Sequence, residues 1–454
     1  MGIWAKSMKK FSLAVLLLLL LVLPYGQANA QALPPKAAPT VPVAVSTLAP
    51  PANSVFNAQQ ATKAYLAEVS PAQQAKAAAF ATGNHWLMLV DALAGLAIAT
   101  LLLFTRLSAR MRNLATRLTR SPVLQAAIYA FQFLVIVTIL TFPLTFYEDF
   151  LRRHAYGISN LSFSQWLGEF ALSSGLGLAG GVIFIAVVYG FIRATPRFWW
   201  AWSTIIAVCF LAFVALIGPV YILPLFNSSV PLKPGSLRSA IVRLADANGV
   251  PSNRIFVVNT SKQSDLLNAN VSGLLGTTRI SLDDTLLKRC TTREILAVVA
   301  HEMGHYVLDH SLMILPWLGL ILFIGFGFVA VSYRGLVRYL GRFWDLREIV
   351  DPAGLPLLYA LFTIYMLAAT PAINTLSRTI EAQADIFGLN AARQPDAFAK
   401  FFLLDAGVDD LTPGPVEEFL FWSHPSAAQR IAVAMRWKAA HIHDPDIANG
   451  PASP

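Results

Sequence analysis

Six long apolar runs, separated by polar stretches, dominate the hydropathy pattern of the chain. A membrane-crossing helix needs about 20 predominantly apolar residues, and each run approaches or exceeds that length. Pro219 and Pro224 interrupt the fourth run near its end. The pattern predicts a mainly α-helical, multi-span membrane protein. The predicted spans are residues 86–104, 123–146, 176–192, 199–226, 312–331 and 355–372.

A shorter apolar run near the N-terminus is typical of a secretory signal peptide. A lysine-containing segment precedes residues 11–23, and an A-x-A cleavage sequence occupies residues 28–30. We therefore predict a signal peptide over 1–30, with an uncleaved first span as the alternative. A Pro- and Ala-rich stretch and an Ala- and Gln-rich stretch follow, and they predict a linker and N-terminal helix over 31–85.

Polar segments flank the last two runs. Residues 254–259 and 278–282 have the composition of strands, whereas the segment that begins at residue 374 is helical in character. The predicted division is a membrane domain with four spans over 86–226 and a second domain over 227–440. The last two spans interrupt this second domain, and a tail over 441–454 follows it.

The composition agrees with a membrane protein. Of 454 residues, 56% are hydrophobic and 13% are charged, whereas soluble domains have about 25% charged residues. The net charge of +9 does not indicate nucleic-acid binding, because the arginines gather in short loops between apolar runs. Cys209 and Cys290 lie in different environments, which argues against a disulfide framework and against a cysteine metal site.

The arginines also predict the orientation of the chain. They concentrate in the loops after the first, third and fifth runs, which share one side if every run crosses the membrane. Positive loops favour the cytoplasm, so the 227–440 domain is expected on the periplasmic side of a bacterial inner membrane. A re-entrant run would exchange the two sides. The arginines are Arg106, Arg110, Arg112, Arg117, Arg120, Arg193, Arg197, Arg334, Arg338, Arg342 and Arg347.

The segment His301-Glu302-Met303-Gly304-His305 carries the strongest chemical signal. Histidines four residues apart share one face of a helix, so both imidazoles can reach one Zn²⁺. Glu302 can then accept a proton from water at the metal. The preceding residues 292–300 lack glycine and proline and are predicted to be helical. The alternative is a solvated helix with two incidental histidines.

A catalytic zinc needs a third protein ligand and an open position for water. A metzincin would have Gly at 308 and His at 311, but this chain has Leu308 and Ser311. His310 follows the motif by five residues and is expected on a different face of the helix. Glu381 and Asp385 are better placed, because their i, i+4 spacing points both carboxylates the same way. Glu381 can ligate, and Asp385 can accept the outer N–H of a ligating histidine.

The ordered motifs resemble the integral-membrane CAAX prenyl protease family, which are gluzincin-type zinc metallopeptidases. The resemblance covers roughly residues 60–437 and includes two spans between the HEMGH motif and Glu381. The chain would be a bacterial-like member that carries the signal peptide predicted above from its N-terminal residues. The matching segments are residues 147–157, 226–227, 231–232, 261–264, 268–269, 279–280, 284–287, 301–305, 377–378, 381, 384–385, 423–426 and 430–431.

The resemblance implies a role for each matching residue near the metal. His301, His305 and Glu381 would bind one Zn²⁺ per chain. Glu302 would act as general base and then as general acid. His424 would donate a hydrogen bond to the oxyanion. These roles correspond to hydrolysis of a peptide bond by a metal-activated water.

The resemblance also implies supporting and substrate-binding residues. Asp385 would orient a ligating histidine, and Arg378 and Arg430 would support the local charge network. Asn268-Ala269-Asn270 would form an edge strand that pairs with the substrate backbone. The family usually has an aromatic residue where this chain has Asn270.

The sequence therefore predicts a helical transmembrane bundle with a zincin-type catalytic domain that contains a small β element. The predicted function is a zinc-dependent, membrane-embedded endopeptidase acting on membrane-bound or membrane-proximal polypeptides, with CAAX-type processing implied by the resemblance. One alternative is a catalytically silent zinc-binding scaffold for membrane-protein quality control, which would not need Glu302. A transporter is a second alternative, but few ionisable groups lie within the spans. The expected partners are a polypeptide substrate and membrane lipid, and no nucleic acid.

Overall fold

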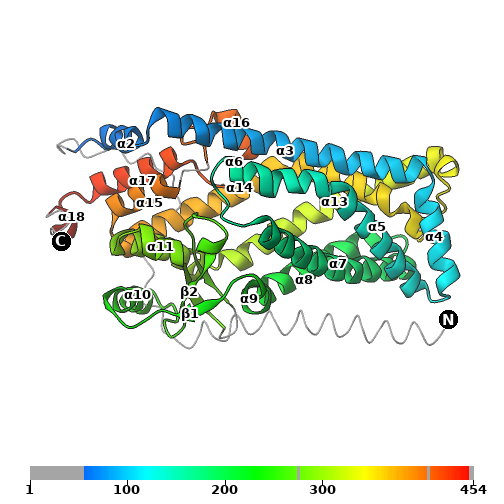
Figure 1. Cartoon of the computed structure of the whole chain (residues 1–454), viewed down its shortest axis with the longest axis horizontal. Helices are drawn as coiled ribbons and strands as arrows, with labels where there is room; N and C mark the ends of the chain where they lie inside the picture. The colour runs from blue at the N-terminus through cyan, green and yellow to red at the C-terminus, as the bar shows by residue number, and fades with distance from the viewer. Residues whose placement is uncertain (1–55, 274–276, 406–408, 449–454) are drawn as a thin grey trace. The chain divides into compact units, whose positions relative to one another are not determined.

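In the computed structural model, the described residues are 56–273, 277–405 and 409–448. The predicted signal peptide and most of the predicted linker lie outside these residues. The described chain is mainly helical, with one small sheet at the end of the molecule that holds α10 and α11 (Figure 1). The prediction of a mainly α-helical, multi-span fold is confirmed.

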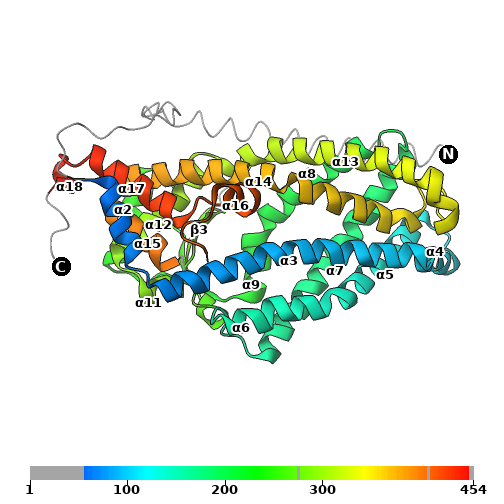
Figure 2. The same ribbon diagram turned by 90° about the horizontal axis from the view of Figure 1, so that it is seen from above.

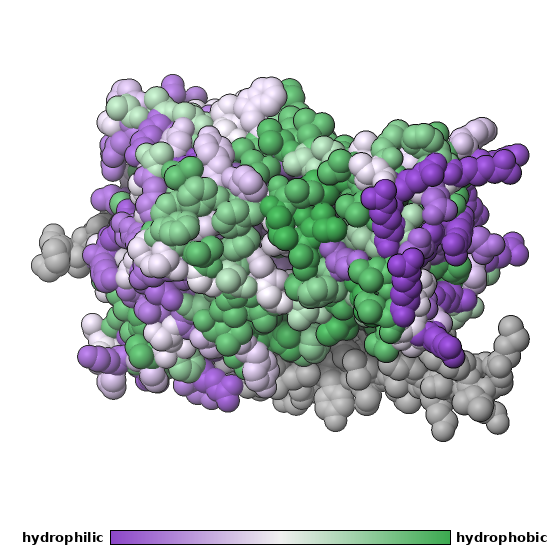
Figure 3. Space-filling view, turned by 45° about the vertical axis from the view of Figure 1, so that its right-hand side comes forward, coloured by the Kyte–Doolittle hydropathy of each residue, from purple (hydrophilic) through white to green (hydrophobic). Residues whose placement is uncertain are grey.

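Six helical segments of the described chain are long and apolar enough to cross a membrane, as the sequence predicts. Figure 3 shows a hydrophobic surface over the middle of the helices, with hydrophilic residues towards both ends. The candidate spans are α3 (Pro71–Phe104), α5 to α6 (Pro122–Ala155), α7 (Phe163–Ala194), α8 to α9 (Trp199–Phe226), α13 (His310–Trp344) and η4 to α14 (Pro352–Ala392).

The remaining helices connect the spans or lie at the end of the molecule that holds the sheet. They are α2 (Ala58–Ala67), α4 (Leu107–Leu118), α10 (Ser236–Ala247), α11 (Asp284–Arg289), α12 (Thr292–Val307), α15 (Pro395–Asp405), α16 (Pro415–Phe421), α17 (Ala427–Ala440) and α18 (Pro445–Ala448). Two spans contain a π-helical turn. In the second span, α5 (Pro122–Thr145) continues as the π-helix η1 (Phe146–Arg152) and then as α6 (Arg153–Ala155). In the fourth span, α8 (Trp199–Ile217) continues as the π-helix η2 (Gly218–Ile222) and then as α9 (Leu223–Phe226). Two 3₁₀ turns, η3 (Thr260–Lys262) and η4 (Pro352–Gly354), complete the set.

Two predicted boundaries do not exist in the structure. The boundary at 85/86 falls inside α3, which starts at Pro71 behind a Ser70 capping box. The predicted break between the last span and the helical segment that begins at residue 374 falls inside α14 (Leu355–Ala392). With 38 residues, α14 is about 57 Å long, whereas a hydrocarbon core is about 30 Å thick. One helix therefore carries both the last span and the segment with Glu381 and Asp385.

The structure brings the three arginine-rich loops to one end of the helices. Arg112 forms ion pairs with Asp345 at 2.8 Å and with Asp351 at 2.7 Å, which joins the loop after α3 to the loop after α13. Trp199, at the turn between α7 and α8, lines a common cavity with Arg334. The catalytic elements α12, α15 and α17 lie at the opposite end (Figures 1 and 2).

The sheet has four strands in the order β1-β2-β4-β3. Its inner face presents Ala269, Val271, Ile280 and Leu282, which pack in the same buried core as Met303 of α12. The predicted strands over 254–259 and 278–282 correspond to β2 and β4. The strands are β1 (Ser229–Pro231), β2 (Ile255–Val258), β3 (Ala269–Ser272) and β4 (Arg279–Asp283).

The predicted linker and N-terminal helix over 31–85 is only partly a connector. From Phe56 onward it packs against the core of the catalytic end, and the Tyr65 hydroxyl donates a hydrogen bond to Asp396 at 2.8 Å. Figure 2 shows α2 beside α15 and α17. The N-terminal part of the described chain therefore stabilises the domain that contains the candidate site.

Candidate active site

Helix α12 carries the HEMGH segment. It begins with a capping box in which the Thr291 hydroxyl accepts a hydrogen bond from the Glu294 backbone, and the Glu294 carboxylate accepts one from the Thr291 backbone. One turn separates His301 from His305, and their Nε2 atoms lie 3.2 Å apart. Both rings therefore point to the same place, as expected for i, i+4 residues of a helix.

Two glycines let α14 approach α12 very closely. A methyl group at Gly388 would lie 3.0 Å from the backbone of His301, and one at Gly304 would lie 3.1 Å from Phe387. Both distances are shorter than ordinary carbon contacts, so the two helices could not pack this closely with larger residues. The close packing brings Glu381 of α14 to the two histidines.

The donor atoms of these three residues lie close together, and a different oxygen of Glu381 faces each histidine. The Nε2 atoms of His301 and His305 are 3.2 Å apart, and oxygens of Glu381 lie 3.3 Å from the first and 3.5 Å from the second. Donors about 2.0–2.1 Å from a tetrahedral zinc lie about 3.3–3.4 Å from one another. Two imidazoles and one carboxylate at these separations fit a zinc site with a fourth position left for water or substrate.

Glu302 offers a second carboxylate close to the histidines. Its donor atoms lie with those of His301 and His305 within a 4.8 Å group, which makes it a geometrically possible ligand. However, its oxygen is 3.9 Å from His301 Nε2, farther than that of Glu381. Burial raises the pKa of Glu302 to about 7, so this carboxyl exchanges a proton near neutral pH. That property suits a general base better than a permanent ligand.

The electrostatics of the two histidines favour a cation between them. Burial disfavours the charged form of His301, but hydrogen bonds to Asp385 and Glu381 outweigh it and raise the pKa of His301 to about 9. Burial, followed by the nearby charge of His301, lowers the pKa of His305 to about 4. The carboxylates therefore favour one positive charge here, which a metal ion supplies as well as a proton does.

Asp385 and Arg430 hold the outer side of His301. An Asp385 oxygen lies 2.9 Å from His301 Nδ1, which leaves the Nε2 lone pair facing Glu381. Arg430 binds Asp385 through Nε at 3.1 and 3.0 Å, and its guanidinium lies 3.7 Å above the centre of the Phe402 ring. All of these groups are buried, so the orientation of His301 is tightly fixed.

His305 has a partner that the sequence argument placed elsewhere. Helix α12 ends at Val307, and Asp309 adopts a left-handed conformation with φ of 53°. The chain therefore turns, and His310 Nδ1 returns to 3.0 Å from His305 Nδ1. The prediction that His310 lies on a different face was wrong, because it assumed that the helix continues.

The ring of His310 is itself anchored. Its Nε2 lies 3.1 Å from the Gln383 side-chain oxygen, so α14 supports His305 through an intermediary. Sequence reasoning placed His310 away from His305 and did not single out Gln383. The available signal was weak: Gln383 lies two residues from Glu381, and Asp309 is a residue type that tolerates the left-handed conformation.

His424, in the C-terminal segment, lies beside the donor atoms of His301, His305 and Glu381. Its Nε2 is 3.4 Å from Glu381, and its side chain is 56% exposed, more than those of His301, His305 and Glu381. Arg378 positions this segment, because it donates a hydrogen bond to the Glu418 carbonyl at 2.8 Å and another to the Trp422 carbonyl. Arg378 therefore fixes the segment that carries His424, and the exposed His424 side chain can donate a hydrogen bond to a ligand at the site.

The predicted substrate strand is β3, an edge of the sheet. Ala269 is buried against the core, whereas Asn268 and Asn270 line a cavity of about 410 Å³ on the other face. Residues of η2 and α9 form the opposite wall of this cavity. Asp283 also lines the cavity, and burial raises its pKa to about 6. Sequence reasoning did not single out Asp283.

Comparison with known proteins agrees with this geometry. A profile described as peptidase family M48 matches residues 231–438, and one described as CAAX prenyl protease N-terminal, five membrane helices, matches residues 54–228. The described chain has four candidate spans in the second region. Together the two matches cover the membrane helices and the whole candidate site.

Individual relatives extend over most of the chain. An uncharacterised metalloprotease of Bacillus subtilis, YhfN, is 33% identical over 324 residues, which cover 70% of this chain and 75% of that protein. CAAX prenyl protease 1 of Saccharomyces cerevisiae is 31% identical over 317 residues, which cover 65% of this chain and 68% of that protein. These similarities favour the peptidase over a scaffold or a transporter.

A solved structure shares the fold. The crystal structure of S. mikatae Ste24p superposes with a TM-score of 0.69 at 23% identity, covering 83% of this chain and 94% of that one. The chain therefore belongs to peptidase family M48, as a multi-span membrane metalloprotease whose N-terminal half is the membrane domain of the CAAX prenyl protease type.

Proposed function

We propose that this protein is a zinc endopeptidase in which His301, His305 and Glu381 hold one zinc ion. The observation that carries the proposal is the cluster of donor atoms. The two histidine Nε2 atoms lie 3.2 Å apart, one Glu381 oxygen lies 3.3 Å from His301 and the other lies 3.5 Å from His305, and the Glu302 carboxyl is beside them. When bound, zinc supplies Lewis-acid polarisation of a carbonyl oxygen and acidifies water.

In this proposal the protein supplies the proton transfers. Glu302 takes the proton of the attacking water and returns it to the leaving amine, and a carboxyl whose pKa is raised by burial to about 7 can do both near neutral pH. His424 donates from Nε2 to the developing negative charge on the carbonyl oxygen. Asp385 and Arg430 keep His301 in the tautomer that presents Nε2.

We further propose that the substrate is an extended polypeptide that pairs with β3. The unpaired edge of this strand offers backbone N–H and C=O groups for such pairing. The Asn268 and Asn270 side chains would then face one side of the bound chain, next to the cavity with Asp283. The name of the yeast relative, a prenyl protease, supports a membrane-anchored polypeptide as the substrate class.

The orientation of the protein is part of the proposal. Three basic loops at one end support a cytoplasmic location of that end, and the candidate site lies at the other end. We therefore place the site on the periplasmic side of a bacterial inner membrane. A cytoplasmic, prenylated substrate would not fit this orientation.

Two variants test the zinc chemistry. Wild type should contain about one zinc per chain, and His305→Ala should lose most of it, because two remaining donors bind zinc weakly. Glu302→Gln should keep its zinc and lose peptide cleavage by a factor of at least about 10². Metal content by mass spectrometry and cleavage of a quenched peptide are the two measurements.

The two outcomes that would contradict the proposal are distinct. Equal zinc content in wild type and His305→Ala would reject the ligand set. Substantial turnover by purified Glu302→Gln would reject Glu302 as the base while leaving the ligands in place. His441→Ala is a suitable control, because His441 is partly buried and its described side-chain contacts are with Trp437, whose carbonyl lies 2.8 Å from His441 Nδ1 and whose ring stacks on the imidazole.

A further inference from the structure

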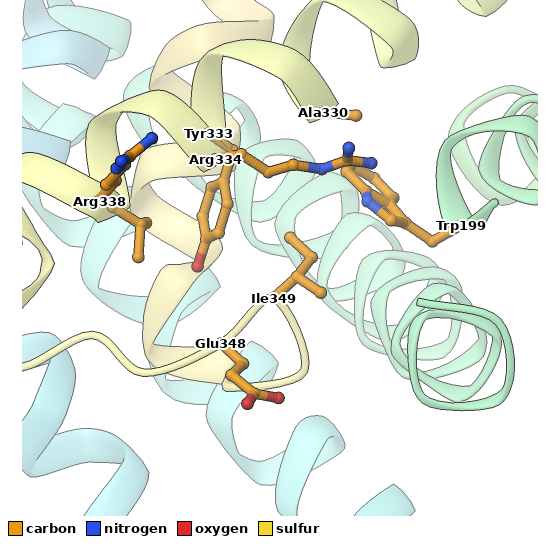
Figure 4. Close-up of a pocket in the computed structure, with 8 residues that line it drawn as sticks. Trp199, Ala330, Tyr333, Arg334, Arg338, Glu348 and Ile349 are labelled. Atoms are coloured by element: carbon orange, nitrogen blue, oxygen red, sulfur yellow. The ribbon is translucent and has the colours of Figure 1, made fainter. Parts of the chain in front are cut away.

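A second cavity lies at the arginine-rich end of the helices. It has a volume of about 420 Å³ and is enclosed by the start of α8, the later turns of α13 and the loop that follows α13 (Figure 4). The distance from the candidate active site is large: Arg334 follows His310 by 24 positions in one helix, about 36 Å. The lining residues are Trp199, Ala330, Tyr333, Arg334, Val337, Arg338, Glu348 and Ile349.

Two arginines give the cavity a positive charge. Arg334 and Arg338 are one turn apart on α13, and neither has an ion pair or a side-chain hydrogen bond with another described residue. Arg112 at the same end is different, because Asp345 and Asp351 neutralise it. The cavity therefore presents two cationic groups that are free to bind an anion.

One acidic residue also lines the cavity. Glu348 is exposed at its rim and has no ion pair with another described residue. With two arginines and one glutamate the lining keeps a net positive charge. Figure 4 shows the Glu348 carboxylate turned away from the Arg334 guanidinium.

The rest of the wall suits a molecule that is both polar and apolar. Trp199 and Tyr333 are each only 2% exposed, and the Tyr333 hydroxyl is buried with no hydrogen-bond partner among the described residues. Ala330, Val337 and Ile349 supply apolar surface. An aromatic and arginine belt of this kind is characteristic of the membrane–water boundary.

The position along α13 agrees with that boundary. The helix has 35 residues and is about 52 Å long, so its last turns extend past a hydrocarbon core of about 30 Å. Val331, one turn before Arg334, is 73% exposed, which places apolar surface directly next to the arginines. A lipid with its phosphate at Arg334 could lay its chains along this surface.

We infer that this cavity binds the headgroup of an anionic phospholipid, with Arg334 and Arg338 supplying the positive charge that attracts its phosphate. Basic pockets between transmembrane helices bind such headgroups through the same charge complementarity. The ligand comes from the surrounding bilayer, so the site needs no soluble partner. The site is independent of the zinc chemistry proposed above.

A lipid titration tests the inference. Delipidated full-length protein in a nonionic detergent is titrated with tail-fluorescent phosphatidylglycerol or phosphatidylcholine. Wild type should prefer phosphatidylglycerol. Arg334→Gln/Arg338→Gln should bind it roughly 25-fold more weakly, because each arginine near a lipid surface changes the affinity about fivefold. Glu348→Gln should bind it more tightly, because the rim loses its negative charge.

A matched control separates the cavity from general charge. Arg117→Gln/Arg120→Gln removes two arginines from the same end of the molecule but from outside the cavity, and it should keep wild-type affinity. Equal weakening by both double variants would overturn the inference, as would equal binding of phosphatidylcholine. Displacement of the lipid by inorganic phosphate alone would identify a free-anion site and reject the lipid.

The inference stays testable if the double variant does not fold. Glu348→Gln is expected to gain affinity, and a gain cannot result from misfolding. No change in Glu348→Gln together with failure of the double variant would count against the cavity as the site. Zinc content and peptide cleavage should be unchanged in all of these variants, so failure of the zinc proposal would be seen separately.

Discussion

At the scale of single residues, the site is organised by which nitrogen of each histidine is available. Asp385 accepts the Nδ1–H of His301, and His310 takes the equivalent position for His305. If His305 Nδ1 carries its proton, His310 Nδ1 accepts it and His310 Nε2 donates to Gln383. Both ligand candidates then present a bare Nε2 to Glu381. The two supports are chemically different: one is a buried carboxylate, the other a neutral imidazole.

We predict that His310→Ala lowers zinc affinity about 10- to 100-fold without preventing folding, because His305 loses the acceptor that fixes its tautomer. Competition with a chromogenic chelator measures the affinity. Gln383→Ala should have a smaller effect in the same direction, since Gln383 acts through His310. Unchanged zinc affinity in His310→Ala would show that His305 needs no such support.

The pH dependence of turnover should report Glu302. Burial raises its pKa to about 7, and only the ionised carboxylate can accept a proton. kcat/KM is therefore expected to be fully developed above pH 7 and to fall as the pH drops, about tenfold per unit well below the pKa. Zinc content measured across the same range is the control. If kcat/KM falls at low pH in parallel with the zinc content, the fall is caused by loss of zinc and not by protonation of Glu302.

At the scale of elements, the contact between α12 and α14 decides the geometry. Gly304 and Gly388 allow the two helices to approach until a methyl group would not fit. The ligand candidates on the two helices are separated by a membrane-crossing hairpin of α13 and α14 in sequence, yet their donors are within 3.5 Å. Gly388→Ala is therefore expected to disturb the site more than an alanine on an exposed helix face.

The strand β3 and its cavity make a second prediction at this scale. Among the described residues that line the cavity, Asp283 is the one ionisable group, and because burial raises its pKa to about 6 it is ionised above that pH. Peptides with Lys or Arg at the position that faces the cavity should be preferred. Asp283→Asn should lower kcat/KM for them roughly tenfold at pH 7.5 and leave neutral peptides unchanged.

Several controls accompany the Asp283 variant. Asp265→Asn removes an exposed carboxylate that lies outside the cavity and should keep the wild-type profile. The melting temperature of Asp283→Asn should be equal or higher, because burial disfavours the ionised carboxylate and raises its pKa. A cleavage profile without any basic preference in wild type would refute the role of Asp283 and leave the zinc chemistry untouched.

At the scale of the whole molecule, charge and chemistry are segregated to opposite ends of the spans. The Arg112 ion pairs with Asp345 and Asp351 tie two of the basic loops together, so these loops behave as one end cap. The sheet, α12 and α17 form the other end. Helix α14 connects the two ends without a break.

This segregation predicts the topology. A phosphatase that is active only outside the cytoplasm should be active when fused after residue 440 and inactive when inserted in the loop between α3 and α5. Positively charged loops favour the cytoplasmic side of a membrane, and the loop between α3 and α5 carries five arginines: Arg106, Arg110, Arg112, Arg117 and Arg120. The reverse activity pattern would reverse the topology and would leave the zinc geometry as it is.

The sequence by itself determined the spans, the mainly helical fold and the metalloprotease family. These follow from local properties, namely runs of apolar residues and the i, i+4 spacing of His301 with His305 and of Glu381 with Asp385. Helical periodicity and membrane length act within one segment, so no knowledge of distant contacts is needed. The strands β2 and β4 were predicted for the same reason.

Only the tertiary structure decided how these segments meet. The partnership of His310 with His305 depends on a left-handed residue, Asp309, that ends the helix where periodicity would continue it. The docking of α2, the role of Gln383 and both cavities arise from contacts between segments far apart in the chain. Such contacts depend on side-chain shape at the packed surfaces, such as the space left at Gly388. No pattern within one segment of the sequence records that information.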